Sequence, residues 1–250
     1  MLLDKDSSTP LYLQLKNLLE KQVEEGLYQD GKAIPSEREL CQAYGVSRIT
    51  VRQAIAQAIA EGLLYRRQGK GTFVVKKKID QSLERITGFE GTIAGQGLLP
   101  VTSLIDVSRA SATEDVAAAL GLEKGSPVVR MILLGLADSE PLALYTSHFA
   151  PELGWAMGEK AAELTRQGRP FTSFDLYKHL DGWKPARARQ TFEAALATGR
   201  VARLLKVKEP TAVFVVTSVV VSSDGSPLEH RIVHYRGDRY KFSVIREVAV

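Results

Sequence analysis

Arg48 and Arg52 are the residues whose type and spacing most directly indicate a chemistry. Side chains four apart on a helix lie about 40° apart around its axis and so share a face. Two guanidinium groups on one face can donate paired hydrogen bonds to neighbouring guanines in a DNA major groove. The alternative is that both form only surface ion pairs, but the acid of the same predicted helix, Glu61, lies more than two turns away.

The pattern around these arginines predicts three helices. The first spans the stretch from the Thr9-Pro10 cap, with proline at the first helical position, to Gly26. The second begins at Ser36, which forms a capping box with Glu39. Gly45 permits a sharp turn, and Ser47 can cap the third helix. Two short helices joined in this way predict a helix-turn-helix, whose second helix enters the major groove by its N-terminal end.

A hairpin is predicted directly after these helices. Two β-prone runs, 63–67 and 72–75, flank the glycine-rich sequence Gln68-Gly69-Lys70-Gly71. After a helix-turn-helix such a hairpin is a wing, in which Lys70 and Arg66 can contact phosphates or the minor groove. A phosphate-cradling nucleotide loop is the alternative, but the order strand, loop, helix that it requires is absent from the sequence.

The positive charge is concentrated in this part of the chain. Residues 1–78 carry 13 basic and nine acidic side chains, whereas residues 79–250 carry 20 of each. A local excess of positive charge attracts a polyanion such as nucleic acid, although it is also compatible with an ordinary solvated face.

These residues also carry a family resemblance. Pro35-Ser36-Glu37-Arg38-Glu39-Leu40, Ser47-Arg48-Ile49-Thr50-Val51-Arg52-Gln53-Ala54 and Gly69-Lys70-Gly71-Thr72-Phe73-Val74 resemble the winged helix of GntR-family transcription regulators. The resemblance implies a homodimer on a short palindrome of double-stranded DNA. It also implies DNA contacts by Arg38, Arg48, Thr50, Arg52 and Gly69, to which the wing adds Arg66 and Lys70.

The charged stretch after the wing predicts a domain boundary. We expect a winged helix-turn-helix domain over 1–75, a linker over 76–88 and a second domain over 89–250. Beyond the linker, β-prone runs alternate with helical patterns near 113–120 and 171–180, which predicts an α+β fold with an antiparallel sheet and flanking helices.

An internal repeat lies in the second domain at an offset of 86 residues. Residues 141–149 align with 227–235, and each copy follows a strand and a polar turn. The repeat predicts two equivalent long hairpins. A cleft between such halves is a common place for a small ligand, and a duplicated core without a pocket is the alternative.

This second domain resembles the chorismate-lyase-like UTRA effector domain of the HutC subfamily. The resemblance rests on residues 118–128, on Glu229-His230-Arg231 and on residues 235–242. It implies an effector site with Glu229 and Tyr235. In relatives that sense sugar phosphates, arginines on the strand before the first turn hold the phosphate, but those positions are Leu133 and Gly135 here.

The other candidates for the effector site are less specific. Arg130 suits a carboxylate or a phosphate, or else an ion pair at a strand edge. Ser173 either contacts the effector or only caps a helix, and Tyr145 is the remaining candidate for contact with the effector. His148 and His234 occupy equivalent repeat positions and fit structural roles better than catalysis.

Several classes are excluded by composition. Four scattered histidines and the single Cys41 do not make a metal cage or a thiol enzyme, and no run of residues is apolar enough for a membrane span. We find no catalytic residues and expect no cofactor or metal. The start of the chain lacks a signal-peptide pattern, so a cytoplasmic location is expected.

The sequence therefore favours a DNA-binding repressor modulated by a small anionic metabolite, either a carboxylate or a phosphorylated compound. The alternative is an enzyme of chorismate-lyase-like fold acting on a small organic acid with an accessory DNA-binding domain, because a fold does not fix a function.

Overall fold

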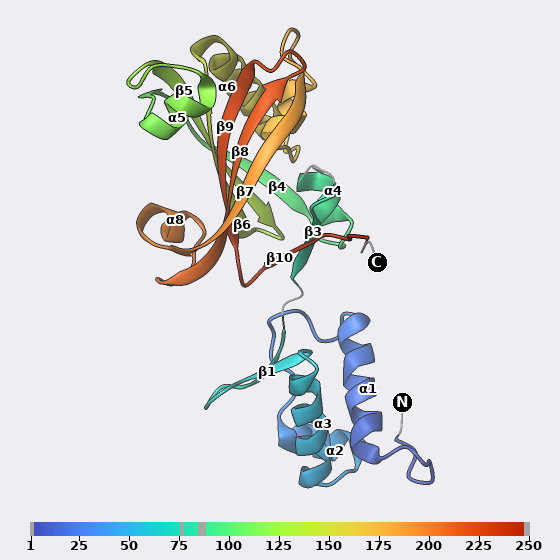
Figure 1. The fold of residues 1–250 in the computed structure, drawn as a ribbon. Coiled ribbons are helices and arrows are strands. Elements are labelled where there is room, and N and C mark those ends of the chain that lie inside the picture. Colours follow the sequence, from blue (N-terminus) through green and yellow to red (C-terminus); the bar gives the residue numbers. More distant parts are fainter. Residues whose placement is uncertain (1–2, 76–77, 85–88, 248–250) are drawn as a thin grey trace. The chain divides into compact units, whose positions relative to one another are not determined.

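The chain divides into two compact units, Met1–Lys77 and Lys78–Val250, in a computed structural model that describes residues 3–75, 78–84 and 89–247. Figure 1 shows the course of the chain through both units. Residues 76–77 and 85–88 of the expected linker lie outside the described residues.

The N-terminal unit contains the three expected helices, α1 (Leu11–Glu24), α2 (Glu37–Tyr44) and α3 (Arg48–Ala60). The capping box is confirmed: the Glu39 amide donates to Ser36 Oγ at 3.3 Å, and Glu39 Oε2 accepts from the Ser36 amide at 2.7 Å. Ser47 Oγ likewise accepts from the Thr50 amide at 3.1 Å. These caps satisfy amides that a helix start leaves unpaired, so they fix where α2 and α3 begin.

The start of α1 differs from the expectation. Pro10 is the N-cap residue rather than the first helical residue, and no side chain caps this helix. The helix is held instead by its apolar face, because Leu15 and Leu19 are fully buried against α3.

The wing follows as expected. Strands β1 (Leu64–Arg67) and β2 (Gly71–Val74) pair antiparallel, with Leu64 opposite Val74 and both side chains buried beneath the helices. Gly69 and Gly71 have φ of 70° and 117°, a backbone that glycine adopts without strain.

The second unit is built on a six-stranded antiparallel sheet of order β4-β5-β6-β9-β8-β7. Its strands are β4 (Pro100–Ser111), β5 (Pro127–Ala137), β6 (Glu140–Phe149), β7 (Pro185–Ala197), β8 (Thr211–Ser222) and β9 (Pro227–Arg236). The predicted duplicated hairpins are β5–β6 and β8–β9, and they meet at the β6–β9 pair in the middle of the sheet. Thr146 lies opposite Ile232, 86 residues later, so the two halves are related by an approximate two-fold axis.

Helices cover both faces of this sheet. One face packs against α4 (Phe89–Ala94), α6 (Pro151–Arg166) and α7 (Ser173–Tyr177) through the largest apolar cluster of the unit, which includes Leu133 and Tyr145. The other face packs against α5 (Glu114–Leu120) and α8 (Gly199–Leu204). The α+β class and the antiparallel sheet are therefore as expected.

Helix α6 approaches the sheet through two glycines. A Cβ atom on Gly154 would lie 2.4 Å from Cβ of Val129, and one on Gly158 would lie 2.7 Å from Cγ1 of Val107. Both contacts are far inside van der Waals distance, and both partners are β-branched side chains with little freedom to move.

We expect Gly154→Ala to lower the free energy of unfolding of the second unit by about 1–2 kcal/mol, because the added methyl group overpacks the interface. Both tryptophans, Trp155 and Trp183, belong to this unit, so urea denaturation followed by tryptophan fluorescence measures it selectively. Gly91→Ala is the control, since a Cβ on Gly91 in α4 meets nothing within 4 Å. Equal midpoints for the two variants would contradict the packing argument.

The expected linker contains a strand that local pattern did not indicate. β3 (Ile79–Ser82) pairs in parallel with β10 (Tyr240–Ser243), which lies more than 150 residues away in sequence. Ile79 is fully buried, and Asp80 forms an ion pair with Lys241 at 2.8 Å. This four-residue segment, with one apolar and three polar residues, is too short to show a period of its own, so only its distant partner makes it a strand.

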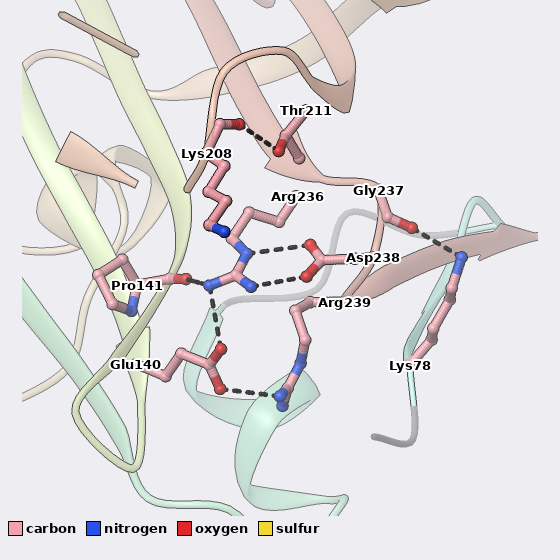
Figure 2. A network of polar contacts seen from close by, with 9 residues as sticks. All are labelled: Lys78, Glu140, Pro141, Lys208, Thr211, Arg236, Gly237, Asp238 and Arg239. Atoms are coloured by element: carbon pink, nitrogen blue, oxygen red, sulfur yellow. Dashed lines mark hydrogen bonds and ion pairs between the residues drawn. The ribbon is translucent and has the colours of Figure 1, made fainter. Parts of the chain in front are cut away.

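The turn between β9 and β10 is held by a network of charged groups, shown in Figure 2. The Glu140 carboxylate contacts Arg236 at 3.0 Å and Arg239 at 2.8 Å. Arg236 also makes a two-pronged contact with Asp238, at 3.0 and 2.7 Å. Lys78 Nζ donates to the carbonyl of Gly237 at 2.7 Å, so the start of β3 is fastened to this same turn.

Candidate nucleic-acid interface and ligand pocket

A groove in the N-terminal unit runs between the N-terminal ends of α2 and α3 and the wing. It is lined by residues 33–39, 48 and 66–72. Five of the seven residues predicted to contact DNA lie along it: Arg38, Arg48, Arg66, Gly69 and Lys70. The remaining two, Thr50 and Arg52, lie on α3 outside the lining of the groove.

Glu37, on α2, links α3 to the wing. Its carboxylate accepts from Arg52 Nε at 2.9 Å and from Arg66 Nη2 at 2.7 Å. The hydrogen bond from Arg52 is the main cause that holds the pKa of Glu37 below its usual value. The acid that pairs with Arg52 therefore lies on the neighbouring helix α2. A search for acids along α3 alone could not identify it. Both arginines stay largely exposed, so DNA phosphates can compete with this pair.

The start of α3 presents three neighbouring side chains. Arg48 is exposed, and among the described residues no acid lies within ion-pair distance of it. Thr50 exchanges a hydrogen bond with Ser47 Oγ at 2.8 Å. Ile49, which was not among the predicted residues, is 71% exposed. Its place outside the apolar stripe of the helix was the available sequence signal, and an apolar side chain there suits a thymine methyl group.

We expect Glu37→Gln to raise the affinity for random duplex DNA several-fold and to steepen its salt dependence by about one unit, because Arg52 and Arg66 are released for phosphates. The preference for a specific site should fall, since Arg52 loses its orientation. Fluorescence anisotropy over a salt series measures both quantities. Glu61→Gln is the matched control: it removes the same charge beside Lys16, at the other end of α3. Equal effects of the two variants would mean that only net charge matters.

The second unit contains a pocket on the sheet face that carries Tyr145. Aromatic rings dominate its walls, and one arginine, Arg231, lines it among the described residues. The lining consists of Gln81, Ser82, Leu83, Phe89, Tyr145, Thr172, Phe174, Gln190, Phe192, Val216, Arg231, Tyr235 and Phe242.

Four of the five predicted effector residues lie at or beside this pocket. Tyr145 and Tyr235 line it, and burial raises the pKa of both hydroxyls, so both stay neutral. Ser173 Oγ accepts from Arg231 Nη1 at 3.2 Å. Glu229 is fully buried and accepts from Ser147 Oγ at 2.6 Å. Thr172, not Ser173, is the N-cap of α7, so Ser173 is free of the capping role considered for it.

The fifth predicted residue, Arg130, does not belong to this group. Leu133 pairs with Tyr145 and Arg130 pairs with His148 in an unbroken register. Because side chains alternate between the faces of a strand, Arg130 points to the opposite face from Tyr145. There it forms an ion pair with Asp106 at 3.0 Å.

Burial keeps three histidines neutral: His148, His230 and His234. Burial, followed by the charges of His230 and Arg130, lowers the pKa of His148 to about 4. Burial also lowers the pKa of His230 and His234. Within the described ranges no group of three or more metal-ligating side chains is close enough to hold a metal ion.

Arg231 was missed as a site residue in the sequence. It is 4% exposed, its guanidinium lies 4.3 Å from the centre of the Phe174 ring, and it lines the pocket. The signal was present in the strand period, because Arg231 shares its parity with Glu229 and Tyr235 on β9.

Both units have known relatives. Residues 11–74 match the model of the gntR family of bacterial regulatory proteins, and residues 95–241 match the UTRA domain. The transcriptional repressor NagR of Bacillus subtilis is 34% identical over 245 residues, which cover 97% of each chain. The transcriptional regulator Rv0792c of Mycobacterium tuberculosis is 32% identical over 95% of this chain and 86% of its own. The crystal structure of PhnF from Mycobacterium smegmatis superposes with a TM-score of 0.62 at 26% identity, covering 95% of this chain and 99% of PhnF.

The fold and the two sites therefore define a transcription regulator with a winged helix-turn-helix and a separate domain for a small-molecule effector. The chain belongs to the GntR family and carries a UTRA domain. It is a regulator rather than an enzyme, which removes the chorismate-lyase-like enzyme as an alternative. No helix in the described part of the chain is long and apolar enough to cross a membrane.

Proposed function

We propose that this protein is a repressor that binds a palindromic operator as a homodimer and that an anionic metabolite in the second unit changes its DNA affinity. The observation that carries the proposal is the groove between the starts of α2 and α3 and the wing, because five of the predicted contact residues, Arg48 among them, line it. A cytoplasmic location follows from the DNA partner.

The proposed roles of the N-terminal residues divide by target. Arg48 and Arg52 read base edges in the major groove, with Thr50 and Ile49 beside them. The other residues position the domain on the phosphates: Arg38, Arg66, Gly69 and Lys70. A homodimer supplies two recognition helices, which must meet half-sites about one helical turn apart.

The proposed effector site contains Tyr145, Ser173, Glu229 and Tyr235. Support comes from the wall of the pocket, which includes Gln81, Ser82 and Leu83. These residues belong to β3 or follow it, and β3 is the first strand after the connection to the winged helix. A ligand in the pocket therefore touches the segment through which the second unit is joined to the first, which is the covalent route for a change in operator binding.

Binding to the protein's own upstream intergenic DNA tests this function. At physiological salt we expect a preference over random duplex of at least about 10³-fold, and two chains per operator by sedimentation. Absence of any preference over random duplex would overturn the proposal. A specific complex that contains one chain per operator would overturn the proposed homodimer but not the proposed regulator function.

A further inference from the structure

We infer that Arg231 anchors an anionic head group, so that the ligand of the pocket is a small organic anion whose carboxylate or phosphate sits against this guanidinium. The inference deepens the proposed function and relies on it only for calling that ligand the effector. The carboxylate and the phosphate share the chemistry that a guanidinium fork recognises.

The main observation is a buried charge without a counter-ion. Arg231 is 4% exposed, and among the described residues no carboxylate lies within 4.0 Å of its guanidinium. Its Nε is buried and has no hydrogen-bond partner. An arginine keeps its charge in any protein environment, and an isolated buried charge is strongly destabilising. A bound anion would supply the missing partner.

The surroundings fix the direction of the side chain without neutralising it. The guanidinium stacks over Phe174 at 4.3 Å and donates from Nη1 to Ser173 Oγ at 3.2 Å. Both contacts come from α7, and neither carries a negative charge. Because the Arg231 guanidinium is held by stacking and by one neutral acceptor, it is preorganised, which lowers the entropy cost of binding an anion.

Glu229 does not form an ion pair with the Arg231 guanidinium. Glu229 lies two residues earlier on the same face of β9, but its Oε1 accepts from Ser147 and its Oε2 is unpaired. The tyrosines of the pocket remain neutral because burial raises their pKa. Neutral hydroxyl groups do not repel an anion in the pocket, as phenolate groups would.

The other buried arginines make the contrast clear. Arg236 and Arg239 are buried to a similar extent, but each contacts Glu140, and Arg236 contacts Asp238 as well. Arg130, on the opposite face of the sheet, is paired with Asp106. Arg231 differs from all three in lining a pocket and in lacking an acid among the described residues.

The test measures anion-dependent stability of the full chain. Sodium chloride is partly replaced by sodium phosphate or by sodium acetate at constant ionic strength, and Tm is followed by thermal scanning. At about ten times its dissociation constant the preferred anion should raise Tm of the native protein by roughly 3–6 °C. Arg231→Met should show none of this rise.

The control is Arg130→Met, which removes an arginine of the same domain that is paired with Asp106 and should keep the full response. Arg231→Lys, which retains the charge but not the fork, should keep part of it and serves if the methionine variant fails to fold. A response to acetate assigns a carboxylate ligand, and a response to phosphate assigns a phosphate. Equal responses of native protein and Arg231→Met, or no response to either anion, would overturn the inference.

The outcome is separable from that of the proposed function. If the protein showed no operator preference but kept the Arg231-dependent rise in Tm, the repressor function would be rejected and the anion site retained. Operator preference without such a response would remove the anion site and leave the DNA-binding function.

Discussion

Replacing Arg48 by alanine should weaken binding to the operator by about 1–3 kcal/mol, a loss of 5- to 150-fold, and should relax the sequence preference at one base pair in each half-site. The physical reason is that Arg48 stands exposed at the start of the recognition helix with no acidic partner among the described residues. Its fork is therefore available to a base edge. Fluorescence anisotropy with operator, with single-base variants of it and with random duplex measures the loss and its sequence dependence.

Lys70→Ala is the matched comparison. Lys70 lies at the tip of the wing between two glycines and carries one charge without a fork. Its removal should weaken operator and random DNA by the same factor and should reduce the salt slope by about one unit. Equal losses on operator and random DNA for Arg48→Ala would show that Arg48 contacts only phosphates.

Arg52 should be less sensitive than Arg48. Its Nε donates to Glu37, so only its Nη atoms are left for a base edge, whereas all the donors of Arg48 are available. A double-mutant cycle of Arg52→Ala and Glu37→Gln on operator binding isolates this coupling.

The N-terminal unit was predictable because its signals are local. The Ser36 and Ser47 caps, the turn at Gly45 and the glycine-rich tip of the wing each act within a few residues, and each is found where the sequence placed it. The contact that was not predictable, Glu37 with Arg52 and Arg66, joins three elements. Only the packing of α2 against α3 and the wing brings those side chains together.

In the second unit, the central hairpins and the helices α5 and α7 were predictable, whereas strand β7 and helix α6 were not. The repeat marked β5–β6 and β8–β9, whose strands are rich in apolar residues and are mostly buried or partly buried. Strand β7 lies at the sheet edge and is mostly exposed, so it lacks the alternation that identifies a half-buried strand. Helix α6 contains Gly154 and Gly158, which lower helix propensity but permit close packing.

The proposed effector site shows the same limit for single residues. Arg130 lies on β5, whose residues pair with the pocket strand β6, but its side chain points to the face opposite the pocket that Arg231 lines. Strand parity relative to Tyr145 would have separated them, but the pairing register that relates β5, β6 and β9 is set by tertiary structure.

Replacing Glu140 by glutamine should lower the free energy of unfolding of the second unit by about 2–4 kcal/mol, because it leaves buried arginine charge without its acid. Arg236 retains Asp238, so the larger part of the cost falls on Arg239, which is 6% exposed and whose Nε already has no partner. The amide of glutamine can accept one hydrogen bond but turns its NH₂ group toward the other guanidinium, where two donors face each other.

Urea denaturation followed by the fluorescence of Trp155 and Trp183 measures this loss. Glu114→Gln is the control, since its ion pair with Lys124 is almost fully exposed at both ends and should contribute close to nothing. An equally small change in unfolding free energy for Glu140→Gln would mean that the Arg239 guanidinium is stabilised by solvent and does not depend on Glu140. The network also holds the turn that anchors the start of β3. Lys78 Nζ donates to the Gly237 carbonyl and the Ile79 amide donates to the Arg239 carbonyl, each at 2.7 Å. Amide exchange at Ile79 should therefore accelerate more in Glu140→Gln than exchange in the middle of β6, around Thr146, because Ile79 donates to a carbonyl of the weakened turn.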